Sequence, residues 1–238
     1  MKKLKIFLFI SLITTTAFSF TLEEQVREYE TRYQLNTRTQ KLVDNKGDGY
    51  ESLYGVRNFR TVLRGIMYRG GANNAYNKFQ KRDNMNPLPD MGLNNLCKEG
   101  FKSSVYLYTT NFSGALKTAS CINVHGDKNK IDYKQITGLD EKNETAFLEM
   151  IYKAIKGQIS SPIYFHCWNG WHSSGLVSTL ALRQFCGLDA NQAVQYWIEN
   201  TDGNSSGYNA IKKRIKDFKP RSQFQITETE RREICLFN

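Results

Sequence analysis

The 238-residue sequence contains only 4 prolines, and it shows no internal repeat and no proline-rich linker. Nothing in it therefore separates the chain into independent globular parts. Hydrophobic residues make up 40% of the chain and aromatic residues 13%, which excludes a disordered or low-complexity protein and allows a core of ordinary size. We predict one globular domain after processing of the N-terminus.

The sequence lacks any apolar stretch of the roughly 20 residues needed to span a bilayer, since the N-terminal one is well short of this length and no later stretch reaches it. The N-terminus has three lysines among its first five residues, an apolar run from Ile6 to Ile13, and the small-x-small sequence Ala17-Phe18-Ser19. This is the pattern of a secretory signal peptide. We predict a signal peptide over residues 1–19, with a retained membrane anchor as the alternative. We therefore expect an exported protein, periplasmic or secreted, with no membrane span after processing.

Positive charge exceeds negative charge in this chain. The formal net charge is +10, and removal of the three N-terminal lysines with the signal peptide lowers it to +7. An excess of this size favours anionic partners. The densest basic group, at residues 212–221, comes without a nucleic-acid-binding motif, and we interpret it as a solvated helix face. We expect no nucleic-acid partner, and the sequence does not predict an oligomeric state.

Five cysteines are an odd number for an exported protein. If Cys167 is a functional thiol, the other four can form two disulfides, in any of three connectivities. We favour Cys97 with Cys121 and Cys186 with Cys235, because each pair joins segments that are nearer in sequence. Export into an oxidising compartment is the physical reason to expect disulfides at all.

Residues 20–59 are interpreted as an N-terminal helical extension, and residues 60–238 as the main domain. Residues 21–35 have apolar side chains at helical spacing, and Thr21 with Glu24 forms a capping box. The glycine- and aspartate-containing stretch 44–49 is predicted to be a turn. It does not fit a calcium loop, because Lys46 stands where an oxygen ligand belongs and no glutamate follows at the twelfth position.

Strand and helix patterns alternate along the main domain. This order is typical of an α/β fold with a central, mostly parallel sheet flanked by helices. The predicted strands cover residues 66–69, which end at a glycine pair, 104–108 and 162–166; the predicted helices cover 88–100, 144–156, 174–186, 189–198 and 208–218.

The most informative segment is His166-Cys167-Trp168-Asn169-Gly170-Trp171-His172-Ser173-Ser174-Gly175. It lies where a buried strand turns into a helix, so backbone amides and the positive end of the helix dipole can hold an anion there. A cysteine thiolate at a helix N-terminus is stabilised and becomes a better nucleophile. Gly170 lets the loop close on a ligand, and Ser174 can hydrogen-bond the thiolate or protonate a leaving group.

This segment resembles the signature of the protein tyrosine and dual-specificity phosphatase superfamily, His-Cys-x-x-Gly-x-x-Arg-Ser/Thr-Gly. The resemblance covers roughly residues 60–220 and implies a dual-specificity-phosphatase-like fold with Cys167 as nucleophile and without a metal or cofactor. The signature arginine is replaced by Ser173. The positions that match in register are His166, Cys167, Gly170, Ser174 and Gly175.

The missing arginine bears directly on activity. In the family it grips two phosphate oxygens and stabilises the transition state, which a serine cannot do. Losing one such donor typically costs on the order of 10² to 10³ in rate. The resemblance also implies a general acid on the loop ahead of the helix that precedes the signature. Asp140 is the best candidate, and Asp132 and Asp127 are alternatives. A turn residue without a catalytic role is an equally good interpretation of Asp140.

The remaining residues of the loop are expected to contact the ligand. The bulky rings of Trp168 and Trp171 either line a pocket for an aromatic or sugar ligand or plug the site. His172 could replace the lost charge when protonated, near its ordinary pKa of about 6.5. The expected ligand-binding residues are Trp168, Asn169, Gly170, Trp171, His172, Ser173 and Gly175.

Three hypotheses follow. The first, which we favour, is an exported pseudophosphatase that binds a phosphorylated or other anionic ligand with little or no hydrolysis. The second is an active cysteine enzyme, either a weak phosphatase that uses Asn169, His172 or a distant basic residue such as Arg69, or an enzyme with altered chemistry. The third is a structural domain in which Cys167 is merely buried.

Overall fold

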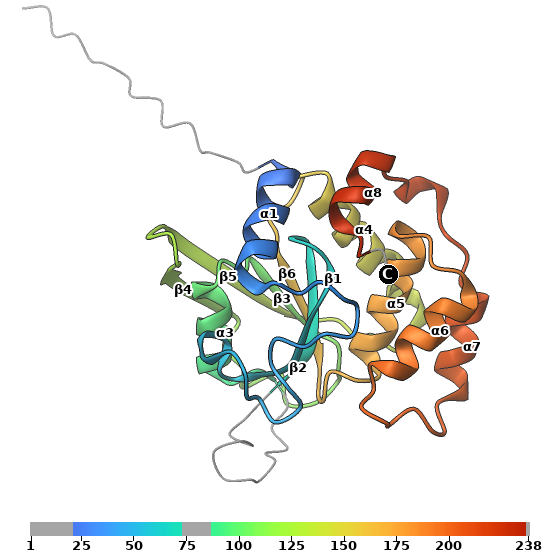
Figure 1. The fold of residues 1–238 in the computed structure, drawn as a ribbon. Coiled ribbons are helices and arrows are strands. Elements are labelled where there is room, and N and C mark those ends of the chain that lie inside the picture. Colours follow the sequence, from blue (N-terminus) through green and yellow to red (C-terminus); the bar gives the residue numbers. More distant parts are fainter. Residues whose placement is uncertain (1–20, 73–86, 237–238) are drawn as a thin grey trace, which may run out of the picture.

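The computed structural model describes residues 21–72 and 87–236 (Figure 1), so the predicted signal peptide lies outside the described residues. A six-stranded sheet in the order β1-β2-β6-β3-β5-β4 forms its centre. The four inner strands run parallel, while β1 and β4 pair antiparallel at the two edges. The predicted α/β fold with a mostly parallel sheet flanked by helices is therefore confirmed. The strands are β1 (Val56–Leu63), β2 (Met67–Ala72), β3 (Ser103–Tyr106), β4 (Thr118–Ile122), β5 (Lys128–Gln135) and β6 (Ile163–Cys167).

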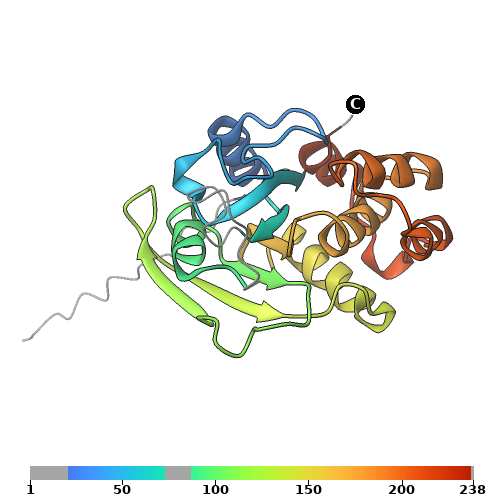
Figure 2. The ribbon, with the colours of Figure 1, turned by 90° about the horizontal axis from the view of Figure 1, so that it is seen from below.

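Helices cover both faces of this sheet. Figure 1 shows α1 and α3 on one side and α5, α6 and α7 on the other, and Figure 2 gives the same layers from below. Each predicted helix is present to within a few residues at its ends. The α-helices are α1 (Leu22–Tyr33), α3 (Asp90–Lys98), α4 (Glu144–Ile155), α5 (Ser173–Phe185), α6 (Ala190–Glu199), α7 (Asn209–Asp217) and α8 (Glu228–Ile234), and the short 3-10 turns are η1 (Glu51–Leu53), η2 (Glu141–Asn143) and η3 (Ser222–Phe224).

The two faces of the sheet differ in composition. On β6, Ile163 and Phe165 join an aliphatic core beneath α4 and α5, whereas Tyr164 joins an aromatic core on the side of α1 and α3. This separation follows from the two-residue period of a strand. Cys167 lies on the face that carries α5, and the ring of His166 stacks on Tyr164 on the opposite face.

Three strands, β1, β4 and β5, were not predicted, and each contains polar residues that obscure the strand pattern. β1 is buried along its whole length although it contains Arg57, Asn58 and Arg60. β5 alternates buried residues with exposed lysines, and β4 pairs with it at the edge of the sheet. Gly70 and Gly71, expected to end the second strand, lie within it.

The N-terminal segment takes part in the main core. The capping box of Thr21 with Glu24 is confirmed at the start of α1. Tyr29 and Tyr33 of this helix are buried in the aromatic core, and β1 runs across the boundary that the sequence placed between residues 59 and 60. At the 44–49 stretch, Asp44 Oδ1 accepts the backbone amides of Lys46 and Asp48, as in a turn.

Both disulfides have the predicted pairing. Cys97 is bonded to Cys121 and Cys186 to Cys235, with Cα atoms 6.1 and 5.7 Å apart. The first joins α3 to the edge strand β4, and the second joins the end of α5 to the end of α8. In the described parts of the chain, no helix has both the length and the apolar character needed to cross a membrane.

Candidate functional site

The loop that carries Cys167 connects the carboxyl end of β6 to the amino end of α5. Cys167 is the last residue of β6 and Ser173 is the first of α5. Because β6 is central in the sheet, with β2 and β3 on either side, the loop lies over the carboxyl edge of parallel strands. The predicted strand-to-helix junction is confirmed.

Cys167 has the only free thiol among the five cysteines. Its side chain is 5% exposed, and its Sγ lies 3.4 Å from the hydroxyl oxygen of Ser174. A hydroxyl at this distance can donate to a thiolate. The structure therefore brings together the two residues to which the sequence assigned nucleophile and hydroxyl donor.

Five consecutive carbonyls of the loop, from residue 168 to residue 172, accept hydrogen bonds from the surrounding protein. A trans peptide places its carbonyl and the amide of the following residue on opposite sides. The amides of residues 169–173 therefore point the other way, and in the parts of the chain that the structure describes they donate to no protein acceptor. Ala72 N donates to the Trp168 carbonyl at 3.1 Å and Asn58 Nδ2 to that of Asn169 at 2.7 Å. Arg69 Nη2 donates to the carbonyls of both Gly170 and Trp171, and Leu176 N to that of His172 at 2.8 Å.

Glycines allow the loop to lie directly on β2. Gly170 has a φ of +79°, and a Cβ there would come within 2.6 Å of the Gly70 carbonyl carbon. A Cβ on Gly71 would come within 2.5 Å of the Asn169 carbonyl carbon. The glycine pair that the sequence suggested as a strand end is therefore required for contact between backbone and backbone.

Arg69 contacts the loop on the side that faces β2, away from the pocket. It lies on β2 opposite Phe165 of β6, it is fully buried, and its Nη2 donates to the carbonyls of Gly170 and of Trp171, the latter at 3.2 Å. A Cβ on Gly175 would lie 3.2 Å from the same nitrogen, so the last signature glycine gives the guanidinium its space. The sequence suggested Arg69 as a ligand-binding residue, but the structure places it behind the loop.

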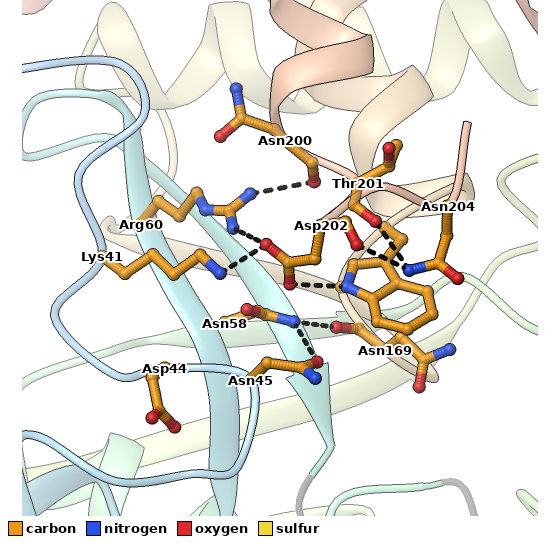
Figure 3. Close-up of polar contacts among 12 residues, drawn as sticks. Lys41, Asp44, Asn45, Asn58, Arg60, Asn169, Asn200, Thr201, Asp202 and Asn204 are labelled. Atoms are coloured by element: carbon orange, nitrogen blue, oxygen red, sulfur yellow. Dashed lines mark hydrogen bonds and ion pairs between the residues drawn. The ribbon is translucent and has the colours of Figure 1, made fainter.

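Asp202 joins the loop to the N-terminal half of the chain (Figure 3). Its carboxylate accepts from Trp171 Nε1 at 2.9 Å and from Lys41, and it lies 3.6 Å from Nη2 of Arg60. Burial opposes ionisation of Asp202, but the hydrogen bonds from Lys41 and Trp171, with the charges of Lys41 and Arg60, outweigh it and lower the pKa. Asp202 was not identified from the sequence, since a lone aspartate in a helix-helix loop carries no motif.

A pocket of about 590 Å³ opens above the loop and reaches Cys167. The rings of Trp168 and Trp171 border this pocket, so of the two alternatives they line the site. Among the described residues, its lining has no lysine, arginine, aspartate or glutamate. The lining consists of Tyr108, Leu139, Cys167, Trp168, Asn169, Trp171, His172, Ser173, Gly203, Asn204, Ser206 and Tyr208.

His172 forms one wall of the pocket. Its ring stacks on Tyr208 with centroids 3.7 Å apart, and its Nε2 lies 2.7 Å from the carbonyl oxygen of Asn204. Burial lowers the pKa of His172, and the hydrogen bond to Asn204 opposes this only in part. A protonated His172 in place of the missing arginine would therefore require a lower pH than the sequence suggested.

His166 supports the loop from the other face of the sheet. It is fully buried, its Nε2 lies 2.8 Å from the hydroxyl of Tyr133, and its Nδ1 lies 3.1 Å from the carbonyl oxygen of Cys167. Burial lowers its pKa to about 3, so the ring is neutral at physiological pH. These contacts suit a residue that positions Cys167.

None of the three aspartates considered as general acid lines the pocket. Asp140 caps the short η2 turn, accepts the backbone amide of Lys142 at 3.1 Å and forms an ion pair with the Lys142 side chain at 2.9 Å. The hydrogen bond from Lys142 lowers the pKa of Asp140, which favours the ionised form. Asp132 forms an ion pair with Lys130 on β5, and Asp127 follows the turn after β4.

Ser173 is only 3% exposed, although it lines the pocket. The backbone of Gly138 packs close to it, since a Cβ on that glycine would lie 3.3 Å from Ser173 Cβ. No charged side chain takes the place of the signature arginine on the pocket side in the described part of the chain. Among the described residues, the cation that donates to the loop is Arg69, on its other side.

No model of a known protein family matches this chain, and no curated protein matches it. Solved structures are similar to it, including the following two. The core catalytic domain of the PP-IP phosphatase SIW14 from S. cerevisiae, in complex with citrate, shares 17% identity at a TM-score of 0.45 over 68% of this chain and 86% of that chain. A second structure, of the Siw14 catalytic core, shares 16% identity at a TM-score of 0.43 over 68% and 85% of the two chains. Values this low carry no functional conclusion.

Proposed function

We propose that this chain binds a phosphorylated or other anionic ligand at the loop of residues 167–175, and that it hydrolyses phosphate monoesters very slowly or not at all. One observation carries the proposal. The carbonyls of residues 168–171 accept from β1 and β2 behind the loop and that of residue 172 accepts from the first turn of α5, so the following amides, without a protein acceptor among the described residues, are inferred to face the pocket above Cys167. Successive amides directed at one point form an anion-binding nest, and the N-terminus of α5 adds its positive dipole.

Two features of the same site support weak catalysis. Ser173 offers no positive charge for the equatorial phosphate oxygens, and this loss alone is worth about 10² to 10³ in rate. The aspartates considered as proton donors lie outside the pocket lining, and the best of them, Asp140, is ion-paired to Lys142. Backbone amides can bind an anion without the arginine or the acid, whereas fast turnover depends on both.

The second candidate is an active cysteine-dependent phosphatase, which the 3.4 Å contact between Cys167 and Ser174 favours. In that reaction the thiolate attacks phosphorus and forms an S–P bond. The bond between phosphorus and the leaving oxygen breaks, and that oxygen takes a proton from Ser174 or water. Water then attacks the phosphocysteine and returns a proton to Ser174 or to solvent, the S–P bond breaks, and inorganic phosphate and the thiolate are released.

We also propose that the protein is exported, to the periplasm or out of the cell. Two disulfides, Cys97 with Cys121 and Cys186 with Cys235, support this proposal, because such bonds persist mainly in oxidising compartments. Fractionation of cells that express the full chain would test it: we expect the processed protein outside the cytoplasm, and retention of an uncleaved chain inside would contradict it.

The central experiment measures hydrolysis of para-nitrophenyl phosphate and binding of inorganic phosphate by the mature chain, beside Ser173→Arg and Cys167→Ser. We expect phosphate binding by the wild type with little turnover, and a gain on the order of 10² to 10³ in Ser173→Arg. Robust wild-type turnover that Cys167→Ser abolishes would replace the proposal with the second candidate. A chain that neither binds phosphate nor turns over in any variant would be the structural domain.

A further inference from the structure

Arg69 is a buried cation that no carboxylate compensates within the described residues. The side chain has no measurable exposure, and no aspartate or glutamate oxygen of residues 21–72 and 87–236 forms an ion pair with it. Its Nε and Nη1 meet no hydrogen-bond acceptor there, although the guanidinium lies 6.0 Å from the ring centroid of Tyr196. Buried charges in proteins are normally paired, because an isolated one is costly.

The surroundings of Arg69 add positive charge. Arg60, on the neighbouring strand β1, is 1% exposed, and burial together with Arg69 lowers its pKa to about 10. Among the described residues, the carboxylate that pairs with Arg60 is Asp202, which is shared with Lys41. The space behind the loop therefore holds more cations than anions.

The positive charge of Arg69 is in direct contact with the loop. Its Nη2 donates to the carbonyls of Gly170 and Trp171. These carbonyls belong to the same peptide groups as the amides of Trp171 and His172, which point toward the pocket. A cation bonded to a carbonyl polarises the whole peptide and makes its amide a stronger donor.

We propose that Arg69 is a positioning residue that supplies, through the peptides after Gly170 and Trp171, part of the positive charge that Ser173 does not supply from the pocket side. The inference rests on the proposed function, because an anion in the pocket is the counter-charge that Arg69 lacks. The interaction with a bound oxyanion grows with its charge. The site is therefore selective for dianionic over monoanionic tetrahedral oxyanions.

Sulfate and perchlorate provide the test, since both are tetrahedral XO₄ anions but carry two charges and one. Their dissociation constants would be measured by calorimetry for the mature wild type, Arg69→Lys and Arg69→Gln. Lysine keeps the charge without the guanidinium fork, whereas glutamine keeps a donor without the charge. Arg183→Met is the matched control, because Arg183 also donates to backbone carbonyls, those of Leu188, Ile215 and Lys216, but from the far end of α5.

We expect Arg69→Gln to weaken sulfate binding at least tenfold and perchlorate binding much less. Arg69→Lys should recover most of the preference for sulfate, and Arg183→Met should change neither anion. An equal loss for both anions, with no recovery by lysine, would reduce Arg69 to a structural support and overturn the inference. Unchanged sulfate affinity in Arg69→Gln would overturn it as well.

Two further outcomes are distinguishable. If the wild type binds neither sulfate nor phosphate, the proposed function itself fails. If Arg69→Gln does not fold by circular dichroism, the comparison uses Arg69→Lys and the wild type. The inference then expects their preferences for sulfate over perchlorate to agree within threefold, and a larger drop in the lysine variant contradicts it.

Discussion

On the face of the sheet that packs against α3, the buried carboxylate of Glu99 is fully matched: Arg32 binds both of its oxygens, at 2.6 and 2.7 Å, and the Tyr33 hydroxyl donates at 3.0 Å. On the face that packs against α5, Arg69 forms no ion pair with a carboxylate among the described residues. It donates its hydrogen bonds to carbonyls of the Cys167 loop. The first charge is neutralised by the fold itself. In our proposal the charge of Arg69 is balanced by a bound anion instead. This difference separates a charge that stabilises the fold from one that serves binding.

The largest expected effect concerns His166, which the aromatic face keeps neutral. Its pKa is about 3 in the folded chain against 6.5 ordinarily, because of burial. The unfolded chain takes up a proton below pH 6.5 and the folded chain does not, so stability falls as the pH is lowered through this window. At about 1.4 kcal/mol per pH unit, the free energy of unfolding should drop by about 4 kcal/mol between pH 6.5 and 3.5.

Urea denaturation across this range, with wild type beside His166→Gln, measures the effect. In the variant, the free energy of unfolding should lose most of the pH dependence that the histidine causes. Any pH dependence that remains comes from other titratable groups. Parallel slopes in the two proteins would show that His166 is protonated in the folded state, and the aromatic face would then tolerate an uncompensated charge too.

Arg32→Met breaks the compensated pair on the same face. Glu99 is 1% exposed, so removal of its partner leaves a buried carboxylate, and the free energy of unfolding should fall by about 3 kcal/mol. Thermal or urea unfolding at pH 7 measures this change. Arg27→Met, which removes an exposed partner of Glu23, is the control and should have no measurable effect. Similar small effects in both variants would mean that Glu99 is not held by Arg32.

Asp202→Asn removes the carboxylate that pairs with Arg60. It should have the smallest effect, a decrease of about 2 kcal/mol in the free energy of unfolding at pH 7. Because the folded pKa of Asp202 lies below 3.8, its contribution is complete above that pH and is lost as the pH falls further. The difference between variant and wild type in urea unfolding should therefore shrink below pH 3.8. Asp217→Asn, in the exposed pair with Lys213, is the control. A difference that persists at low pH would mean that Asp202 acts through packing alone.

The sequence predicted the strand, loop and helix around Cys167 better than it predicted the outer strands of the sheet. The apolar run before Cys167, the serine after it and the helix stop at Gly187 are local signals, and the structure confirms the strand, the loop and the helix that they predict. β1 was not predicted, because Arg57, Asn58 and Arg60 interrupt the apolar pattern that marks a buried strand. Their burial depends on partners far along the chain, Asn169 and Asn200 among them, which no local pattern contains.

The same reason explains where the site prediction was incomplete. Arg69 and Asp202 reach the loop from β2 and from the α6–α7 connection, 101 and 31 residues away in sequence from the residues they bind, Gly170 and Trp171. A signature describes the residues of one loop, not the residues behind it. The orientation of the loop peptides is set by those distant donors and follows only from the three-dimensional structure.

The pairing of the four other cysteines has a practical consequence. Cys167 is the single thiol left free, so a thiol reagent should modify this protein at one position and with a stoichiometry of one. Intact-mass spectrometry after exposure to an electrophile would then report the occupancy of one pocket, without any mutation to remove competing sites. A fluorescent or isotopic label on that sulfur would lie among Trp168, Trp171 and Tyr208, and ligands could be found by competition with labelling before any substrate is identified.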